Sequence, residues 1–185
     1  MTKQNYVVLV DPSDKEIGIM EKNQAHLEGV LHRAVSVFIF NSKGEWLLQR
    51  RASHKYHSAG EWSNTSCTHP FRGETYHEAA QRRVFEEMGI KPQIQQKFQF
   101  IYKAELCNEM TEHELDTVFI GFSDEEPVIN ESEVCDYRYM TTSDLLKEVE
   151  HFPERYTPWF KKLFPRIKDL IEKEKKEHIE DVKQS

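Results

Sequence analysis

Residues 68–90, THPFRGETYHEAAQRRVFEEMGI, contain a complete set of helix signals. Thr75 and Glu78 have the spacing of a capping box, in which each residue satisfies a free backbone N–H at the start of a helix. Gly89 stands where a glycine commonly ends one. Apolar residues repeat between these limits at every fourth position, at Tyr76, Ala80, Val84 and Met88. The sequence therefore predicts a helix from Thr75 to Met88 with one face in the core.

Runs of β-prone residues lie on both sides of this helix. They are residues 6–10, 17–21, 33–51 with an NSKG turn inside, 95–104 and 115–122. The first two are expected to pair as a hairpin, and residues 52–75 to form a loop. Further helices are predicted at 143–150 and from 159 to about 177, where Pro165 should kink or split the second one. The pattern predicts an α/β fold in α+β layers: a mixed sheet between helices, with an N-terminal β-hairpin extension.

Composition limits the classes of function. A chain of 185 residues with 38% hydrophobic and 31% charged residues indicates one soluble domain. The net charge of −7 argues against a nucleic-acid partner, and no apolar run approaches the ~20 residues of a membrane span. Three cysteines without metal-finger spacing, and no signal-peptide pattern, favour a cytoplasmic location. A small anionic substrate stays possible if cations gather locally.

Two carboxylates and three histidines have the makings of a metal site. Glu112 and Glu114 are separated by one residue at the entry to a predicted strand, so both point to one face and His113 to the other. A solvated edge strand is the ordinary alternative. With His26, His32 and His69 the pair would form a mixed N/O shell, which suits an octahedral divalent metal better than structural zinc. The other histidines are interpreted as surface residues: His54, His57, His77, His113, His151 and His178.

Cys67 lies in the segment NTSCTHP, among small polar residues and two positions before His69. A lone cysteine is more often a small buried thiol than a catalyst. The remaining cysteines, Cys107 and Cys135, match no functional pattern and are taken as structural.

The helix segment resembles the Nudix box, whose consensus is G-x5-E-x7-R-E-U-x-E-E-x-G-U with U an aliphatic residue. Matching positions are Glu74, Arg82, Val84, Glu86, Glu87, Gly89 and Ile90. Thr68 replaces the leading glycine, and Arg83 replaces the glutamate that helps Nudix hydrolases hold magnesium. The second change removes an acidic ligand and adds a cation for diphosphate. A solvated Arg83–Glu87 pair on the helix surface is the alternative.

From about Tyr6 to Phe164 the chain is similar to the type 1 isopentenyl diphosphate isomerases, a branch of the Nudix superfamily with this altered box. The resemblance implies a single Nudix-like isomerase domain over residues 1–185, with a core at about 30–165 and a charged C-terminal helix at about 166–185. It implies that Cys67, Glu114 and Tyr102 are catalytic. It gives five metal ligands at the first site, His26, His32, His69, Glu112 and Glu114, with Glu87 on a second magnesium.

The same resemblance places the diphosphate on Lys22, Arg51, Lys55 and Arg83, and the isoprenoid unit against Trp159. The implied cofactors are Mn²⁺ or Mg²⁺ at the His3Glu2 site, with Zn²⁺ possible, and Mg²⁺ with the substrate. The implied partner is an isoprenoid diphosphate, without nucleic acid or membrane, and the expected state is a monomer or weak homodimer. Two other classes were weighed: a Nudix pyrophosphohydrolase, opposed by Arg83, and a metal-binding protein without catalysis.

Overall fold

The computed structural model describes residues 5–55, 57–106 and 109–184, with side chains described up to residue 174. Along the chain the elements are β1 (Tyr6–Val10), β2 (Glu16–Glu21), α1 (Lys22–Glu28), β3 (His32–Phe40), β4 (Trp46–Arg51), β5 (Trp62–Ser63), β6 (Ser66–Thr68), α2 (Tyr76–Met88), β7 (Gln93–Glu105), β8 (Thr111–Phe122), β9 (Val134–Met140), α3 (Thr142–His151), a 3-10 turn (Pro153–Arg155) and α4 (Pro158–Gln184). No helix in this part of the chain is both long and apolar enough to cross a bilayer.

Strand β3 is the centre of a mixed sheet. It pairs in parallel with β8 along its whole length, from His32 opposite Glu114 to Phe40 opposite Phe122. Its other edge is shared in turn by β1, β6 and β4, all antiparallel. Strand β7 continues the sheet beyond β8, and β9 and β5 continue it beyond β4. The predicted mixed sheet and N-terminal hairpin are confirmed, and the arrangement belongs to the α+β class.

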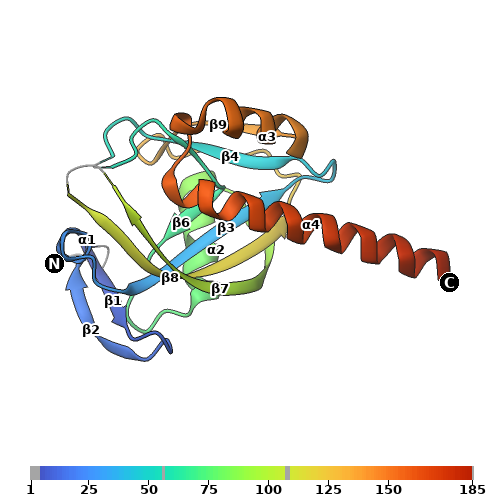
Figure 1. Cartoon of the computed structure of the whole chain (residues 1–185). Helices are drawn as coiled ribbons and strands as arrows, with labels where there is room; N and C mark the ends of the chain where they lie inside the picture. The colour runs from blue at the N-terminus through green and yellow to red at the C-terminus, as the bar shows by residue number, and fades with distance from the viewer. Residues whose placement is uncertain (1–4, 56, 107–108, 185) are drawn as a thin grey trace.

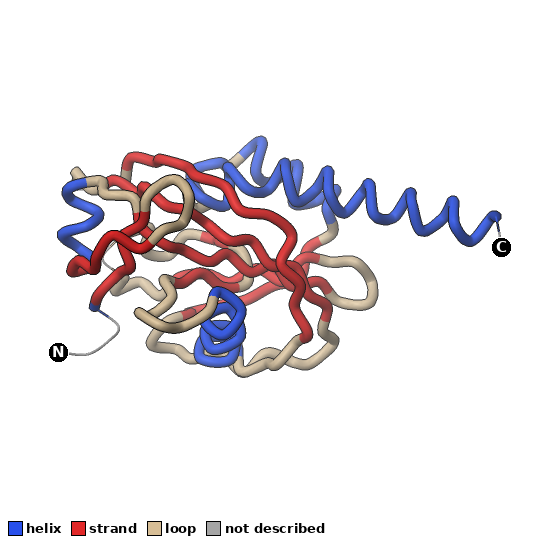
Figure 2. Tube along the Cα trace, turned by 90° about the horizontal axis from the view of Figure 1, so that it is seen from below, coloured by secondary structure: helices blue, strands red, loops and turns tan. Residues whose placement is uncertain are grey.

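The two faces of the sheet carry separate apolar cores. Successive strand residues point to opposite faces, and β3 accordingly divides its side chains. Phe38 and Phe40 pack on the α4 side, whereas Val35, Val37 and Ile39 pack on the α2 side. Figure 2 shows the strands lying between α2 and α4. Because both faces of β3 are covered, its nearly continuous apolar sequence is buried.

Helix α2 begins and ends as the sequence predicts. The Thr75 hydroxyl accepts the N–H of Glu78, the Glu78 carboxylate accepts the N–H of Thr75, and Gly89 ends the helix in the left-handed conformation. Ala80, Val84 and Met88 are fully buried against the sheet. These caps fix where the helix starts, and therefore where its polar side chains lie.

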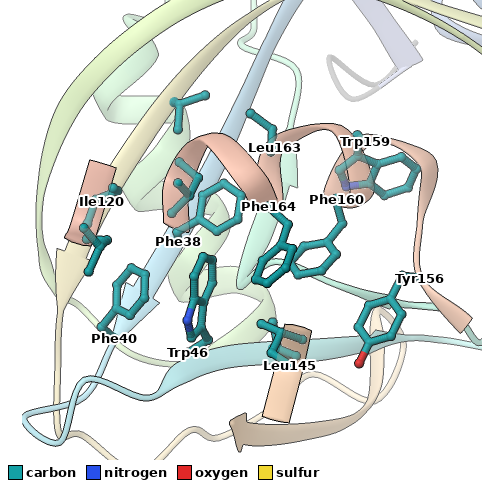
Figure 3. Packing of buried hydrophobic residues seen from close by; sticks show 14 of the residues in the cluster. Phe38, Phe40, Trp46, Ile120, Leu145, Tyr156, Trp159, Phe160, Leu163 and Phe164 are labelled. Carbon is teal, nitrogen blue, oxygen red and sulfur yellow. The ribbon is translucent and has the colours of Figure 1, made fainter. Parts of the chain in front are cut away.

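Helix α4 covers the other face with a row of stacked aromatic residues. Tyr156, Phe160 and Phe164 stack at centroid distances of 5.3 and 5.6 Å, and Trp159 lies at the end of this cluster (Figure 3). Of the predicted kink or split at Pro165, the split is wrong, because α4 runs through this residue as one helix. Burial of Leu163 and Phe164 before Pro165, and of Ile167 and Ile171 after it, offsets the backbone hydrogen bond that proline cannot make. The C-terminal part extends beyond the sheet (Figure 1).

Three features were not predicted. Residues 22–28 form α1, which is too short to leave a clear periodic signal. The segment expected to be a loop contains the short strands β5 and β6. Strand β9 follows a long polar segment and pairs with β4. Tertiary pairing determines such short elements more than local propensity does.

The two glycines that flank α2 give a test of packing against backbone strain. Both have positive φ, but a Cβ on Gly89 would lie 2.7 Å from the Val128 carbonyl oxygen, whereas a Cβ on Gly73 meets nothing within 4 Å. Gly73→Ala should therefore lower the free energy of unfolding only by the ~1–2 kcal/mol that an L-residue costs in the left-handed conformation. Gly89→Ala should lower the free energy of unfolding, measured with urea, by at least about 1 kcal/mol more than Gly73→Ala does. Equal losses would show that Val128 moves away at no cost.

Candidate active site

The predicted site residues meet around one cavity of about 270 Å³. Those that line it are Lys22, Arg51, Lys55, Cys67, His69, Arg83, Glu87, Tyr102, Glu112, Glu114 and Trp159. They come from α1, β4, β6, α2, β7, β8, α4 and the segments between them. The two other predicted residues, His26 and His32, lie against His69 at ring distances of 5.7 and 5.0 Å.

Three histidines and one glutamate converge on a single point. The possible ligand atoms of His26, His32, His69 and Glu114 all lie within 4.8 Å of one another. The Nε2 atoms of His69 and His32 are 3.0 and 3.6 Å from the same oxygen of Glu114. Glu112 is outside this group of four, so its place as a fifth ligand stays a prediction.

This donor set fits a divalent cation. The Val30 carbonyl holds His32 through Nδ1 at 2.7 Å, and within the described part of the chain the buried Nε2 of His32 has no hydrogen-bond partner. Burial lowers the pKa of His26 to about 2 and that of His69 to about 4, so both rings are neutral at pH 7. Neutral imidazole is the form that binds metals.

Tyr102 joins the two carboxylates. Its hydroxyl is 2.6 Å from Glu114 Oε2 and 3.0 Å from Glu112 Oε2. Burial and the nearby Glu114 raise the pKa of Glu112 well above its ordinary value. Burial alone would do the same to Glu114, but His32 and His69 hold its pKa well below the usual range. The pKa values of the two carboxyl groups are thus shifted in opposite directions, and the Tyr102 hydroxyl, which can donate to either of them, lies between them.

Cys67 lies across the same cavity, on β6. Its register with β3 places it opposite Ser36. The thiol donates to the Asn64 side-chain oxygen at 3.2 Å and lies 4.0 Å from the Ser36 hydroxyl. Burial, followed by the charge of Asp116, raises the pKa of the thiol. Cys67 is consequently a thiol, not a thiolate, in this environment.

Four cations gather at another part of the cavity. Lys55 and Arg83 both contact the Glu133 carboxylate. Burial and the neighbouring Lys55 and Arg83 lower the pKa of Lys22 to about 8. The buried Nε of Arg51 has no hydrogen-bond partner among the described residues. Such a cluster is suited to a multiply charged anion.

Arg83 pairs with a buried carboxylate, not with a solvated one. Its NH2 group is 2.7 Å from Oε1 of Glu87. The Glu87 residue is only 3% exposed, and its Oε2 accepts a hydrogen bond from Gln49 at 2.8 Å. Arg83 also lines the cavity. The interpretation as a solvated pair on the helix surface is therefore wrong, because the fold buries the carboxylate partner.

Trp159 closes the cavity on the α4 side. The Arg51 guanidinium lies 5.1 Å from the centre of its ring, and His57 meets it edge-on at 5.8 Å. The prediction that His57 is a surface residue is wrong: it is 7% exposed and lines the cavity. Cys135 is exposed, and Cys107 lies outside the described residues.

Sequence reasoning missed four residues near the reacting groups: His57, Asn64, Asp116 and Glu133. Asp116 is buried, accepts from Ser36 at 2.7 Å, and has its pKa raised to about 8 by burial. Only its period-two spacing from Glu114 could have indicated that it faces the site. Asn64 could have been noticed as the buried polar neighbour of Cys67 in NTSCTHP. Nothing local distinguishes Glu133 from surrounding acidic residues.

Comparison with known proteins agrees with this architecture. The family model described as NUDIX domain matches residues 30–160. A solved structure from Deinococcus radiodurans has a TM-score of 0.73 at 20% identity, covering 87% of this chain and 98% of that one. A MutT protein from Methanosarcina mazei has a TM-score of 0.61 at 23% identity, covering 75% and 94%. The fold is thus that of the Nudix class.

Curated relatives narrow the class. An isopentenyl-diphosphate Delta-isomerase of Pectobacterium atrosepticum is 47% identical over 88% of this chain and 91% of its own length. An isopentenyl-diphosphate Delta-isomerase 2 of Photorhabdus laumondii is 48% identical over 85% and 89%. This chain belongs to the isopentenyl-diphosphate Delta-isomerase family.

The metal cluster predicts that two histidines, His69 and His113, differ in their effect on metal binding. His69→Ala removes one of the four converging ligands and should lower metal affinity by at least roughly tenfold. His113→Ala is the matched control, because His113 lies between the two glutamates but contacts the Gly29 carbonyl on the opposite face. Metal per chain, measured by elemental analysis after dialysis against limiting Mn²⁺, should fall only in His69→Ala. Equal stoichiometry in both variants would contradict the site.

Proposed function

We propose that the chain interconverts isopentenyl and dimethylallyl diphosphate by adding one proton and removing another. The observation that carries this proposal is that Cys67 and Glu114 line one cavity together with four cations and an indole. One cavity thus offers two proton-exchanging groups, a diphosphate-binding region and an aromatic surface. An isomerase that moves a double bond needs all of these.

In the forward direction a proton joins C4 of isopentenyl diphosphate, and the C3–C4 π electrons form the new C–H bond. The positive charge then rests on C3. Loss of a proton from C2 lets the C2–H electrons form the C2–C3 double bond, so atoms and electrons balance. We assign these two transfers to Glu114, with Tyr102 as relay, and to Cys67.

Trp159 protects the charged state between the two transfers. An indole face attracts a cation, and the effect is larger where water is excluded. Water in contact with the C3 cation would add to it and give an alcohol. Trp159 is 4% exposed, which suits it to both tasks.

The diphosphate is assigned to Lys22, Arg51, Lys55 and Arg83. Arg51 offers a buried N–H that has no hydrogen-bond partner among the residues described, and Lys55 and Arg83 are held side by side by Glu133. Charge-assisted hydrogen bonds of this kind are worth roughly 1.5–3 kcal/mol each. They bind the diphosphate without attacking it.

We assign Mn²⁺ or Mg²⁺, with Zn²⁺ as an alternative, to His26, His32, His69 and Glu114, with Glu112 as a fifth ligand. Mg²⁺ on the diphosphate is assigned to Glu87, whose buried carboxylate adjoins Arg83. When bound, a divalent cation would supply positive charge that orients Glu114 and tunes its proton affinity. We further propose that residues 1–185 act as one cytoplasmic domain, as a monomer or weak homodimer.

Proton NMR of the metal-loaded protein with isopentenyl diphosphate in deuterated buffer tests this function. The expected result is the allylic isomer with deuterium incorporated and no release of phosphate. Release of phosphate from this substrate or from a nucleoside diphosphate derivative would favour a hydrolase instead. Neither reaction in the metal-loaded protein would favour a binding role.

Replacing the thiol should stop turnover. Cys67→Ala removes one of the two proton-exchanging groups, so kcat should fall by at least roughly 10³-fold, while metal content and unfolding temperature stay near wild type. Cys135→Ala is the matched control, because that thiol is exposed and outside the cavity. The NMR assay measures both. Wild-type turnover in Cys67→Ala would eliminate the proposed role.

Lys22 predicts a dependence of substrate binding on pH. A pKa near 8 means that its ammonium is charged below pH 8 and loses its charge as the pH rises through that value. KM for isopentenyl diphosphate should therefore increase by roughly 3- to 10-fold between pH 7 and 9. Lys22→Arg keeps its charge over this range, and its KM should stay flat. The same increase in both proteins would place the titrating group elsewhere.

A further inference from the structure

We infer that Asn64 is a positioning residue: it fixes the Cys67 thiol and, through Ser63, ties it to the indole of Trp159. This inference rests on the proposed roles of Cys67 and Trp159. Three of the four members are almost fully buried, with exposures of 0% for Asn64, 2% for Ser63 and 4% for Trp159. The direction of every hydrogen bond between them follows from the chemistry of the groups.

The orientation of the Asn64 amide is determined by two backbone carbonyls. Its Nδ2 donates to Val37 O at 3.1 Å and to Ser66 O at 2.8 Å, which uses both amide hydrogens. A flipped amide would set its oxygen against both carbonyl oxygens. Oδ1 must therefore point the other way, and it can only accept. It accepts from the Cys67 thiol at 3.2 Å and from the Ser63 hydroxyl at 2.9 Å.

The Ser63 hydroxyl is equally constrained. Trp159 Nε1 can only donate, and it donates to Ser63 Oγ at 2.9 Å. The single hydrogen of Ser63 then goes to Asn64, and Thr157, 3.1 Å away, donates to the remaining lone pair of Ser63. The resulting chain runs from the indole N–H through the serine hydroxyl to the amide oxygen, which also receives the thiol.

This series of hydrogen bonds connects two different elements that line the cavity. Cys67 belongs to β6 and Trp159 to α4, and both line the cavity. A proton donor or acceptor must hold its position to a fraction of an ångström for efficient transfer. The β6 backbone fixes the Cα of Cys67, and among the described residues Asn64 makes the shortest hydrogen bond to the sulfur, since the Ser36 contact is 4.0 Å and the Ser36 hydrogen goes to Asp116. Asn64 thereby fixes the position of the thiol relative to the Trp159 indole, which lines the same cavity.

Two variants test this series of hydrogen bonds, one by removing the acceptor of the thiol and one by removing a competing donor. Asn64→Ala should lower kcat by roughly 10- to 100-fold while KM changes by less than about threefold, because the diphosphate contacts are elsewhere. Its Cys67 S–H stretch, isolated by subtracting the infrared spectrum of Cys67→Ala, should move to higher wavenumber as the thiol loses its acceptor. Ser63→Ala keeps the acceptor but removes its second donor, so the same band should move to lower wavenumber.

Thr65→Ala is the matched control. Thr65 is a buried loop residue beside Asn64, but in the described structure its hydroxyl bonds the backbone of Ile39 and Leu47. It should lower stability without moving the S–H band or separating kcat from KM. Should Asn64→Ala fail to fold, the Ser63→Ala spectrum decides by itself. An unmoved band in both variants would overturn the role of Asn64, as would a proportional change of kcat and KM. A wild-type protein without isomerisation would overturn the proposed function instead.

Discussion

The parallel register of β3 and β8 is the constraint on which the rest of the site depends. It places His32 directly opposite Glu114, and the β7 register places Tyr102 opposite the same glutamate. Directly paired residues point to the same face, so three functional side chains are adjacent without any loop to guide them. A slip by one residue would turn Glu112 and Glu114 away and bring His113 into their place. That slip would also exchange the β3 side chains between the two apolar cores, each of which packs a particular set of them.

Burying so many polar groups costs desolvation free energy, and this cost is smaller because the groups share partners. Glu114 is surrounded by imidazoles and the Tyr102 hydroxyl, and Glu133 contacts two cations at once. A buried charge without a partner would be far more costly than one in such a network. Strands carry His32, Tyr102 and Glu114, and helix α2 carries Arg83, so the positions of these groups are held before substrate arrives. This is the condition under which electrostatic groups contribute most to catalysis.

The polar network and the apolar core meet at Trp159. Its ring belongs to the α4 cluster with Phe160, while its N–H enters the hydrogen-bond chain to Asn64. Core packing of α4 therefore also determines the geometry of the cavity. Damage to that core, at Phe160 for example, would change the reaction site as well as stability. The continuity of α4 through Pro165 has the same origin, because the residues on both sides of it are buried in that core.

The sequence by itself determined the helix from Thr75 to Met88, the main strands, and a set of candidate site residues. Caps and period-two patterns are local, so they can be recognised without contacts. Only the tertiary structure decided which residues meet. It buried His57, brought Glu133 onto Lys55 and Arg83, and aimed Asn64 at the thiol. The burial of His57 and the contacts of Glu133 depend on segments far apart in the chain, and the orientation of Asn64 depends on the distant Val37 carbonyl. No local pattern encodes a contact whose energy depends on a distant partner.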